Sequence, residues 1–166
     1  MGLSFNHVVV HEGRRMMIKQ NLQVSNGTMM SNPNLYLYHY YEEKIGPFRN
    51  LSALTPDKAN ELMDKIKNEG VVFASQRPDD YLIIRRELEA KARDLFIQKG
   101  GKPIHLYPHY MTLGPCSWIQ KWYTDGRELK IHIDEFDPER ISFTYGDLFP
   151  TMRLKDDKSY RGKLYT

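Results

Sequence analysis

Two long segments of this chain carry the hydrophobic spacing of helices, and strand-forming segments stand before, between and after them. The first segment begins at Thr55, an N-cap residue followed by a proline suited to the first helical position, and stops at Gly70. The second begins after Asp80, stops at Gly100, and carries an apolar stripe along one face. We therefore expect two main helices.

The remaining ordered segments are rich in strand formers or alternate between apolar and polar residues. They are residues 35–41, 71–75, 104–113, 129–133 and 141–145, with a further candidate at 162–166. A strand–helix–strand–helix order, followed mostly by strands, predicts an α+β domain with a mixed or antiparallel sheet. With 166 residues, the chain has the length of one domain that can bury its own core.

The first 34 residues differ from the rest, because no helical or strand period persists in them. We predict a loosely attached leader at 1–34 and a single α+β domain at 35–166. On this interpretation the natural start could lie at Met29 or Met30. The alternative assigns residues 5–10 to an N-terminal strand that joins the sheet.

The cysteine content and the net charge indicate in which compartment the protein works and which classes of partner it binds. Cys116 is the single cysteine, so no disulfide can form within the chain, which suits a reducing compartment. No stretch approaches the ~20 apolar residues of a membrane-spanning helix. The net charge of +3 is spread along the chain without a basic stripe, so nucleic acid is not indicated as a partner. We predict a cytoplasmic protein without a membrane contact.

The tyrosine-rich segment LYLYHYY contains the first candidate site residue, His39. Strand alternation places Leu37, His39 and Tyr41 on one face and Tyr40 on the other. In a catalytic interpretation, the strand fixes the imidazole and Glu42 or Glu43 orients or ionises it. In the alternative interpretation, His39 is a structural hydrogen-bonding residue of the sheet.

Three arginines gather around the start of the second helix. Arg85 and Arg86 lie in its first turns, where the backbone dipole is positive, and Arg77 precedes it. Because arginine binds phosphate through a two-pronged fork, Arg85 and Arg86 are predicted to bind ligand. The alternative is a set of solvated charges paired with Glu89 and Asp79.

The segment FTYGD places Tyr145 and Asp147 at a strand end, which is a usual position for site residues. We assign Tyr145 to ligand binding and Asp147 to catalysis, and a turn-forming Gly-Asp pair is the alternative. His105 and His109 would lie about 13 Å apart on a strand, too far to share one ion. No metal site is predicted.

The segments YHYYEEKIGPFRNLS, FASQRPDDYL and ISFTYGDLFPT resemble an uncharacterised family of small bacterial cytoplasmic proteins. The resemblance begins near Leu35, covers nearly all of the rest and does not cover the leader. It supplies no activity and no catalytic residues. Members of that family continue past the equivalent of YRGKLYT, which implies that this chain is shortened at its C-terminus.

The layout also resembles that of ADP-ribosyltransferase-like domains, many of which begin with a strand reading LYH and reach a second strand similar to VVFAS. This resemblance implies that His39 helps to hold NAD. The sequence departs from the pattern where Tyr40 and Tyr41 replace the glycine or threonine that follows this histidine. No late catalytic glutamate corresponds either.

These observations predict a domain that binds, or acts on, a phosphate-bearing small molecule, with NAD as a candidate nucleotide. Whether the protein is an enzyme stays open. The alternative is a non-enzymatic interaction protein that binds another protein or nucleic acid through its tyrosines and arginines. The two hypotheses differ in geometry, because a ligand site requires His39, Asp147 and Arg85 to converge, whereas an interaction surface would scatter them.

Overall fold

A computed structural model describes residues 6–10 and 35–166 of the chain. In these ranges the strands form one five-stranded sheet with the order β4-β2-β3-β1-β5, in which every neighbouring pair is antiparallel. The strands are β1 (Asn6–Val10), β2 (Tyr36–Glu42), β3 (His109–Leu113), β4 (Gly126–His132) and β5 (Ile141–Tyr145). The predicted α+β class with two main helices is confirmed.

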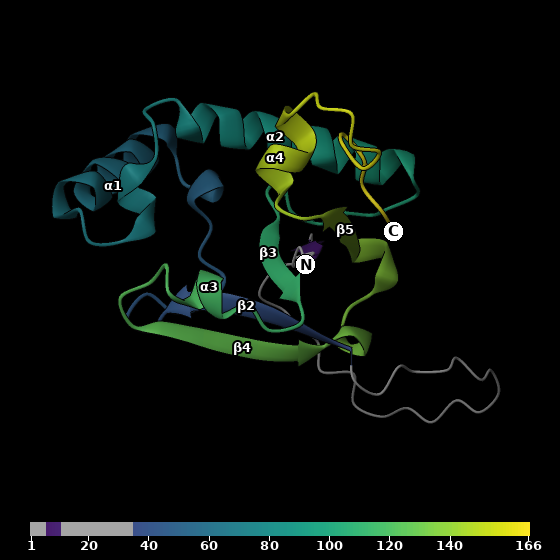
Figure 1. Cartoon of the computed structure of the whole chain (residues 1–166), viewed down its shortest axis with the longest axis horizontal. Coiled ribbons are helices and arrows are strands. Elements are labelled where there is room, and N and C mark those ends of the chain that lie inside the picture. The colour runs from purple at the N-terminus through teal and green to yellow at the C-terminus, as the bar shows by residue number, and fades with distance from the viewer. Residues whose placement is uncertain (1–5, 11–34) are drawn as a thin grey trace.

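The longest helix, α2, runs across one side of the molecule (Figure 1). The α-helices are α1 (Pro56–Glu69), α2 (Tyr81–Gln98), α3 (Ser117–Gln120) and α4 (Leu148–Arg153). The 3-10 helices are η1 (Leu51–Ala53), η2 (Phe73–Gln76), η3 (Ile133–Glu135) and η4 (Pro138–Arg140). No helix of the described residues is long and apolar enough to cross a membrane.

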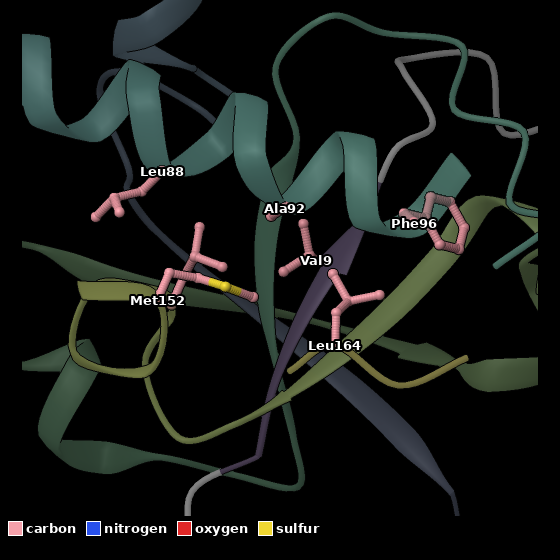
Figure 2. Packing of buried hydrophobic residues seen from close by; sticks show 7 residues of the cluster. Val9, Leu88, Ala92, Phe96, Met152 and Leu164 are labelled. Carbon is pink, nitrogen blue, oxygen red and sulfur yellow. The ribbon is translucent and has the colours of Figure 1, made fainter. Parts of the chain in front are cut away.

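The two faces of the sheet carry separate hydrophobic clusters. In Figure 2, Leu88, Ala92 and Phe96 of α2 lie against Val9 of β1, and α4 and the C-terminal segment complete this cluster. The opposite face is packed by Val10, Leu37, Met111, Ile131, Phe136 and Ile141. On the α2 side, the short helix α3 and its N-cap residue cover β2, the strand next to the edge strand β4, with Cys116 and Ile119 against Tyr40. The alternation predicted for LYLYHYY is confirmed, because Leu37 and Tyr40 belong to clusters on opposite faces.

The limits of both main helices agree with the sequence signals. Helix α1 begins at Pro56 and ends before Gly70, whose φ of 63° is the left-handed conformation that glycine adopts without strain. Helix α2 follows Asp80 and ends before the glycine pair at 100–101. These ends are predictable because they depend on the conformational preferences of a few neighbouring residues.

The expectation of a loosely attached leader is wrong for residues 6–10, which form β1 between β3 and β5. The strand that the alternative assigned to this stretch is present, and Val9 and Val10 are buried on its two faces. A run of valine has high strand propensity but is too short to show a period, so its place depends on its partners. Residues 1–5 and 11–34, including Met29 and Met30, lie outside the described residues.

The predicted buried strand at 71–75 is also wrong. Residues from Phe73 onward form η2, and the side chain of Val71 is 72% exposed. A short apolar run does not distinguish a strand from a helical turn, and this one follows α1 without any strand beside it. At 104–113 the strand begins only at His109, after the proline, and at 162–166 a single bridge joins Tyr165 to Phe143.

Candidate functional site

His39 lies where β2 and β3 separate. Their described register ends at the pair formed by Tyr38 and Thr112. Beyond this point the imidazole of His39 connects the two segments, because Nδ1 donates to the carbonyl oxygen of Tyr110 at 2.9 Å. The backbone N–H of Phe48 donates to Nε2, also at 2.9 Å. The side chain therefore occupies a gap in the sheet.

Both ring nitrogens of His39 are occupied by backbone groups. Because Nε2 accepts a hydrogen bond, the proton lies on Nδ1 and the imidazole is neutral. Burial lowers the pKa of His39 below its ordinary value of 6.5, although the hydrogen bond to Tyr110 acts in the opposite direction. The ring also stacks on Phe48, with 4.4 Å between centroids, and Phe48 has a φ of 56°. These contacts favour the structural interpretation of His39 over the catalytic one.

Replacement of His39 by alanine should lower the free energy of unfolding by about 1–3 kcal/mol, because the Phe48 N–H and the Tyr110 carbonyl lose their partner. Urea unfolding of the wild type and His39→Ala measures this loss. The exposed His105→Ala is the matched control and should be within about 0.5 kcal/mol of the wild type. An unchanged stability of His39→Ala would instead support a site role.

The pH dependence of stability distinguishes the buried imidazole from simple packing. The unfolded chain takes up a proton at His39 near pH 6.5, whereas the folded protein resists protonation because the pKa is lower there. The contribution of His39 to stability is therefore complete above pH 6.5 and is lost as the pH falls towards the folded pKa. The melting temperature of the wild type should fall more steeply than that of His39→Ala between pH 7 and pH 5.

A polar network joins α2 to β3 on the other side of the sheet. The guanidinium Nε of Arg85 donates to Glu89 Oε1 at 2.8 Å and to the hydroxyl of Ser52 at 2.9 Å, and Nη1 donates to the hydroxyl of Tyr81 at 3.0 Å. The hydroxyl of Tyr110 donates to the same Glu89 oxygen at 2.7 Å. The Glu89 side chain is fully buried, and its second oxygen has no hydrogen-bond partner among the described residues.

In this network the positive charge of Arg85 is paired with the negative charge of Glu89. Burial raises the pKa of the Tyr110 hydroxyl well above its ordinary value, and the neighbouring Glu89 carboxylate also raises it, so that this hydroxyl remains a donor. Arg85 and Glu89 are four residues apart on one helix, the spacing at which opposite charges meet. The pairing with Glu89 that the sequence alternative named is present, but the pair is removed from solvent instead of solvated, and Asp79 pairs with Lys67 instead.

Arg86 binds backbone carbonyl groups of the preceding segment. Its guanidinium donates to the carbonyl oxygen of Ser52 from Nε at 3.3 Å and from Nη2 at 3.2 Å, and to that of Leu54 at 2.7 Å. With Arg85 on the hydroxyl of Ser52, the two arginines fix η1 against α2. Their donors are largely used within the protein.

Asp147 and Tyr145 lie at the end of β5, as expected, but in different settings. The carboxylate of Asp147 accepts a hydrogen bond from the backbone N–H of Phe149 at 2.7 Å and caps α4. The side chain of Tyr145 packs on Tyr160, with 4.5 Å between ring centroids. Asp147 is near enough to Arg77 for its charge to raise the pKa of that guanidinium.

Arg77 differs from Arg85 because no ion pair joins it to a carboxylate among the described residues, although the charge of Asp147 acts on it. Its guanidinium lies 4.3 Å from the centroid of the Tyr81 ring, and among the described residues it forms no hydrogen bond or ion pair. The side chain is partly buried, and this burial lowers the pKa of Arg77, with the positive charge of Arg85 acting in the same direction. Tyr81, Tyr123 and Asp147 oppose the shift without cancelling it.

The structure brings together only some of the predicted site residues. Arg85 and the charge of Asp147 both act on Arg77, and Tyr81 contacts both arginines, one through its ring and one through its hydroxyl. His39 shares a strand face with Leu37, which packs on the side of the sheet opposite α2. The ring of Tyr145 contacts Tyr160 instead of this group.

Several members of the group around Arg77 were not among the predicted site residues. Glu89 could have been chosen from its four-residue spacing to Arg85, which is visible in the sequence. For Tyr81, Tyr110 and Tyr123 no sequence signal distinguishes them from the other tyrosines. In the described part of the chain, no group of three or more potential metal ligands occurs.

Comparison of this chain with protein-family models, with curated proteins and with solved structures found no match.

Proposed function

We propose that this chain is a cytoplasmic domain that binds, or acts on, a phosphate-bearing small molecule at Arg77, and that this molecule is a nucleotide such as NAD. The observation that carries the proposal is a partly buried guanidinium that lies on the Tyr81 ring and forms no ion pair among the described residues, although the charge of Asp147 acts on it. A charge removed from water costs free energy unless it is paired, and an anionic ligand would supply the missing pair. The fork of the guanidinium matches the oxygens of a phosphate.

The surroundings of Arg77 support a ligand with both charged and aromatic parts. The Tyr81 ring carries Arg77 on its face and also stacks on Phe149, with 5.2 Å between centroids and nearly parallel planes. Arg85 adds a second positive charge at the hydroxyl of Tyr81, but Glu89 neutralises it. Arg77 is therefore the group that a phosphate would contact, and Arg85 keeps Tyr81 in place.

Replacement of Arg77 by methionine should weaken phosphate binding by about 10- to 150-fold, the equivalent of one or two charge-assisted hydrogen bonds. Inorganic phosphate, ADP-ribose, NAD and ATP serve as probes, and the shift in melting temperature measures binding by mass action. The exposed Arg153→Met removes the same charge elsewhere and should keep the wild-type shift. If none of the four probes raises the melting temperature of the wild type, the proposal fails.

The alternative function, a non-enzymatic interaction protein, is favoured by one observation. His39 and Arg85 lie on opposite sides of the sheet, which is the scattered arrangement expected of an interaction surface. The same titrations separate the two functions, because an interaction protein would show no phosphate-dependent shift in wild type or Arg77→Met.

A further inference from the structure

Three aromatic rings form a cluster that reaches the surface, and one of them, Phe73, lies four positions before Arg77 in the chain. Phe73 of η2 stacks on Trp122 with 4.6 Å between centroids and 19° between planes, and Trp118 of α3 meets Trp122 edge-on at 4.8 Å. The side chain of Phe73 is 45% exposed and that of Trp118 is 55% exposed. Single exposed apolar residues are common, but grouped aromatic rings of this kind are typical of binding sites.

Two chain connections join this aromatic cluster to Arg77. Phe73 is the first residue of η2 and Arg77 directly follows that helix, so a rise of about 2 Å per residue separates them by roughly 8 Å along its axis. The second connection runs through Tyr123, which directly follows Trp122 in the chain. Burial raises the pKa of Tyr123, and the positive charge of Arg77 opposes this effect, so Arg77 lies near Tyr123. The aromatic cluster and Arg77 therefore belong to one region.

We propose that Phe73 and Trp118 form the surface on which the base of the bound nucleotide stacks, while Arg77 holds its phosphate. This inference rests on the proposed function. It adds a site for the base, which is the part that makes the ligand a nucleotide. A nucleobase is a flat ring with a π-face, and proteins bind such rings on exposed aromatic side chains beside arginine. Because Trp122 covers one face of Phe73, the exposed area of Phe73 is its remaining face and edge.

A nucleotide fits this region better than an apolar protein segment does. An apolar segment would cover the aromatic rings and leave the partly buried guanidinium of Arg77 without an ion pair. A nucleotide carries a flat apolar ring and an anionic phosphate in one small molecule. Both unsatisfied features of the region would then be satisfied by a single ligand.

Tryptophan fluorescence tests this inference directly, because both tryptophans of the chain, Trp118 and Trp122, belong to the cluster. The probes are AMP, ribose 5-phosphate, inorganic phosphate and adenosine, with affinities measured by calorimetry. AMP should quench the fluorescence and bind at least about fivefold more tightly than ribose 5-phosphate, which has no base.

Single variants distinguish the contribution of the base to the affinity from that of the phosphate. Phe73→Ala and Trp118→Ala should weaken AMP binding by about 5- to 150-fold and leave the affinity for ribose 5-phosphate unchanged. Arg77→Met should weaken both compounds. Tyr165→Ala removes a half-exposed aromatic ring from the last residues of the chain and should change neither.

Each outcome decides between the two proposals. Equal affinities for AMP and ribose 5-phosphate, without quenching, would overturn the stacking surface and leave the phosphate site intact. Quenching by adenosine through Trp118, without any phosphate binding, would support the stacking surface and overturn the phosphate site. Failure of all four compounds to bind would overturn both.

Discussion

A chain that begins at Met30 is expected to lose its cooperative unfolding transition, because it lacks β1. This strand pairs with β3 on one side and β5 on the other, so its removal separates β5 from the rest of the sheet. Val9 and Val10 are 0% and 2% exposed and belong to the two clusters on opposite faces. Their burial alone is worth about 1.5–3 kcal/mol each, against a total stability of roughly 5–15 kcal/mol for an ordinary domain.

Thermal unfolding and near-ultraviolet circular dichroism measure this loss. A chain that begins at Phe5 keeps β1 and is the matched control, and it should melt within a few degrees of the full chain. If the chain that begins at Met30 melts cooperatively near the wild-type temperature, the central position of β1 is wrong.

Glu89→Ala should lower the free energy of unfolding by about 3–5 kcal/mol. The substitution leaves the buried guanidinium of Arg85 without its carboxylate and the hydroxyl of Tyr110 without its acceptor. Urea unfolding gives the loss. Glu87→Ala, an exposed position two residues earlier on α2, should change stability by no more than about 0.5 kcal/mol.

A double variant shows whether the loss comes from the broken ion pair. Replacing both charges, in Arg85→Met with Glu89→Leu, removes the uncompensated guanidinium and should recover part of the stability lost in Glu89→Ala. If the loss of the double variant equals the sum of the losses of Arg85→Met and Glu89→Leu, each measured alone, Arg85 and Glu89 do not act as a pair.

Local residue preferences were sufficient to predict both main helices and most strands. The proline at 56 and Gly70 set the limits of α1 by their own backbone conformations, which need no contact from elsewhere in the chain. Alternation along 36–41 likewise set the two faces of β2, because side chains of a strand point to opposite sides. The number of main helices and the α+β class follow from such signals.

The candidate site was predictable only in part. The arginines around the start of α2 were recognisable as a group, and the pairing of Arg85 with Glu89 follows from their spacing on one helix. That Arg77, of the three arginines, forms no hydrogen bond among the described residues depends on which partners Arg85 and Arg86 have used. Those partners include Ser52, more than thirty residues earlier in the sequence.

The sequence by itself determined where the two main helices begin and end and which residues of β2 share a face, because these properties depend on neighbouring residues. Only the tertiary structure decided that β1 lies inside the sheet, that Val71 is exposed, and that His39 fills the gap between β2 and β3. The bond from His39 to Tyr110 spans 71 positions of the chain. Such contacts exist only after distant segments have packed, since the sequence around either residue does not specify which partner it meets.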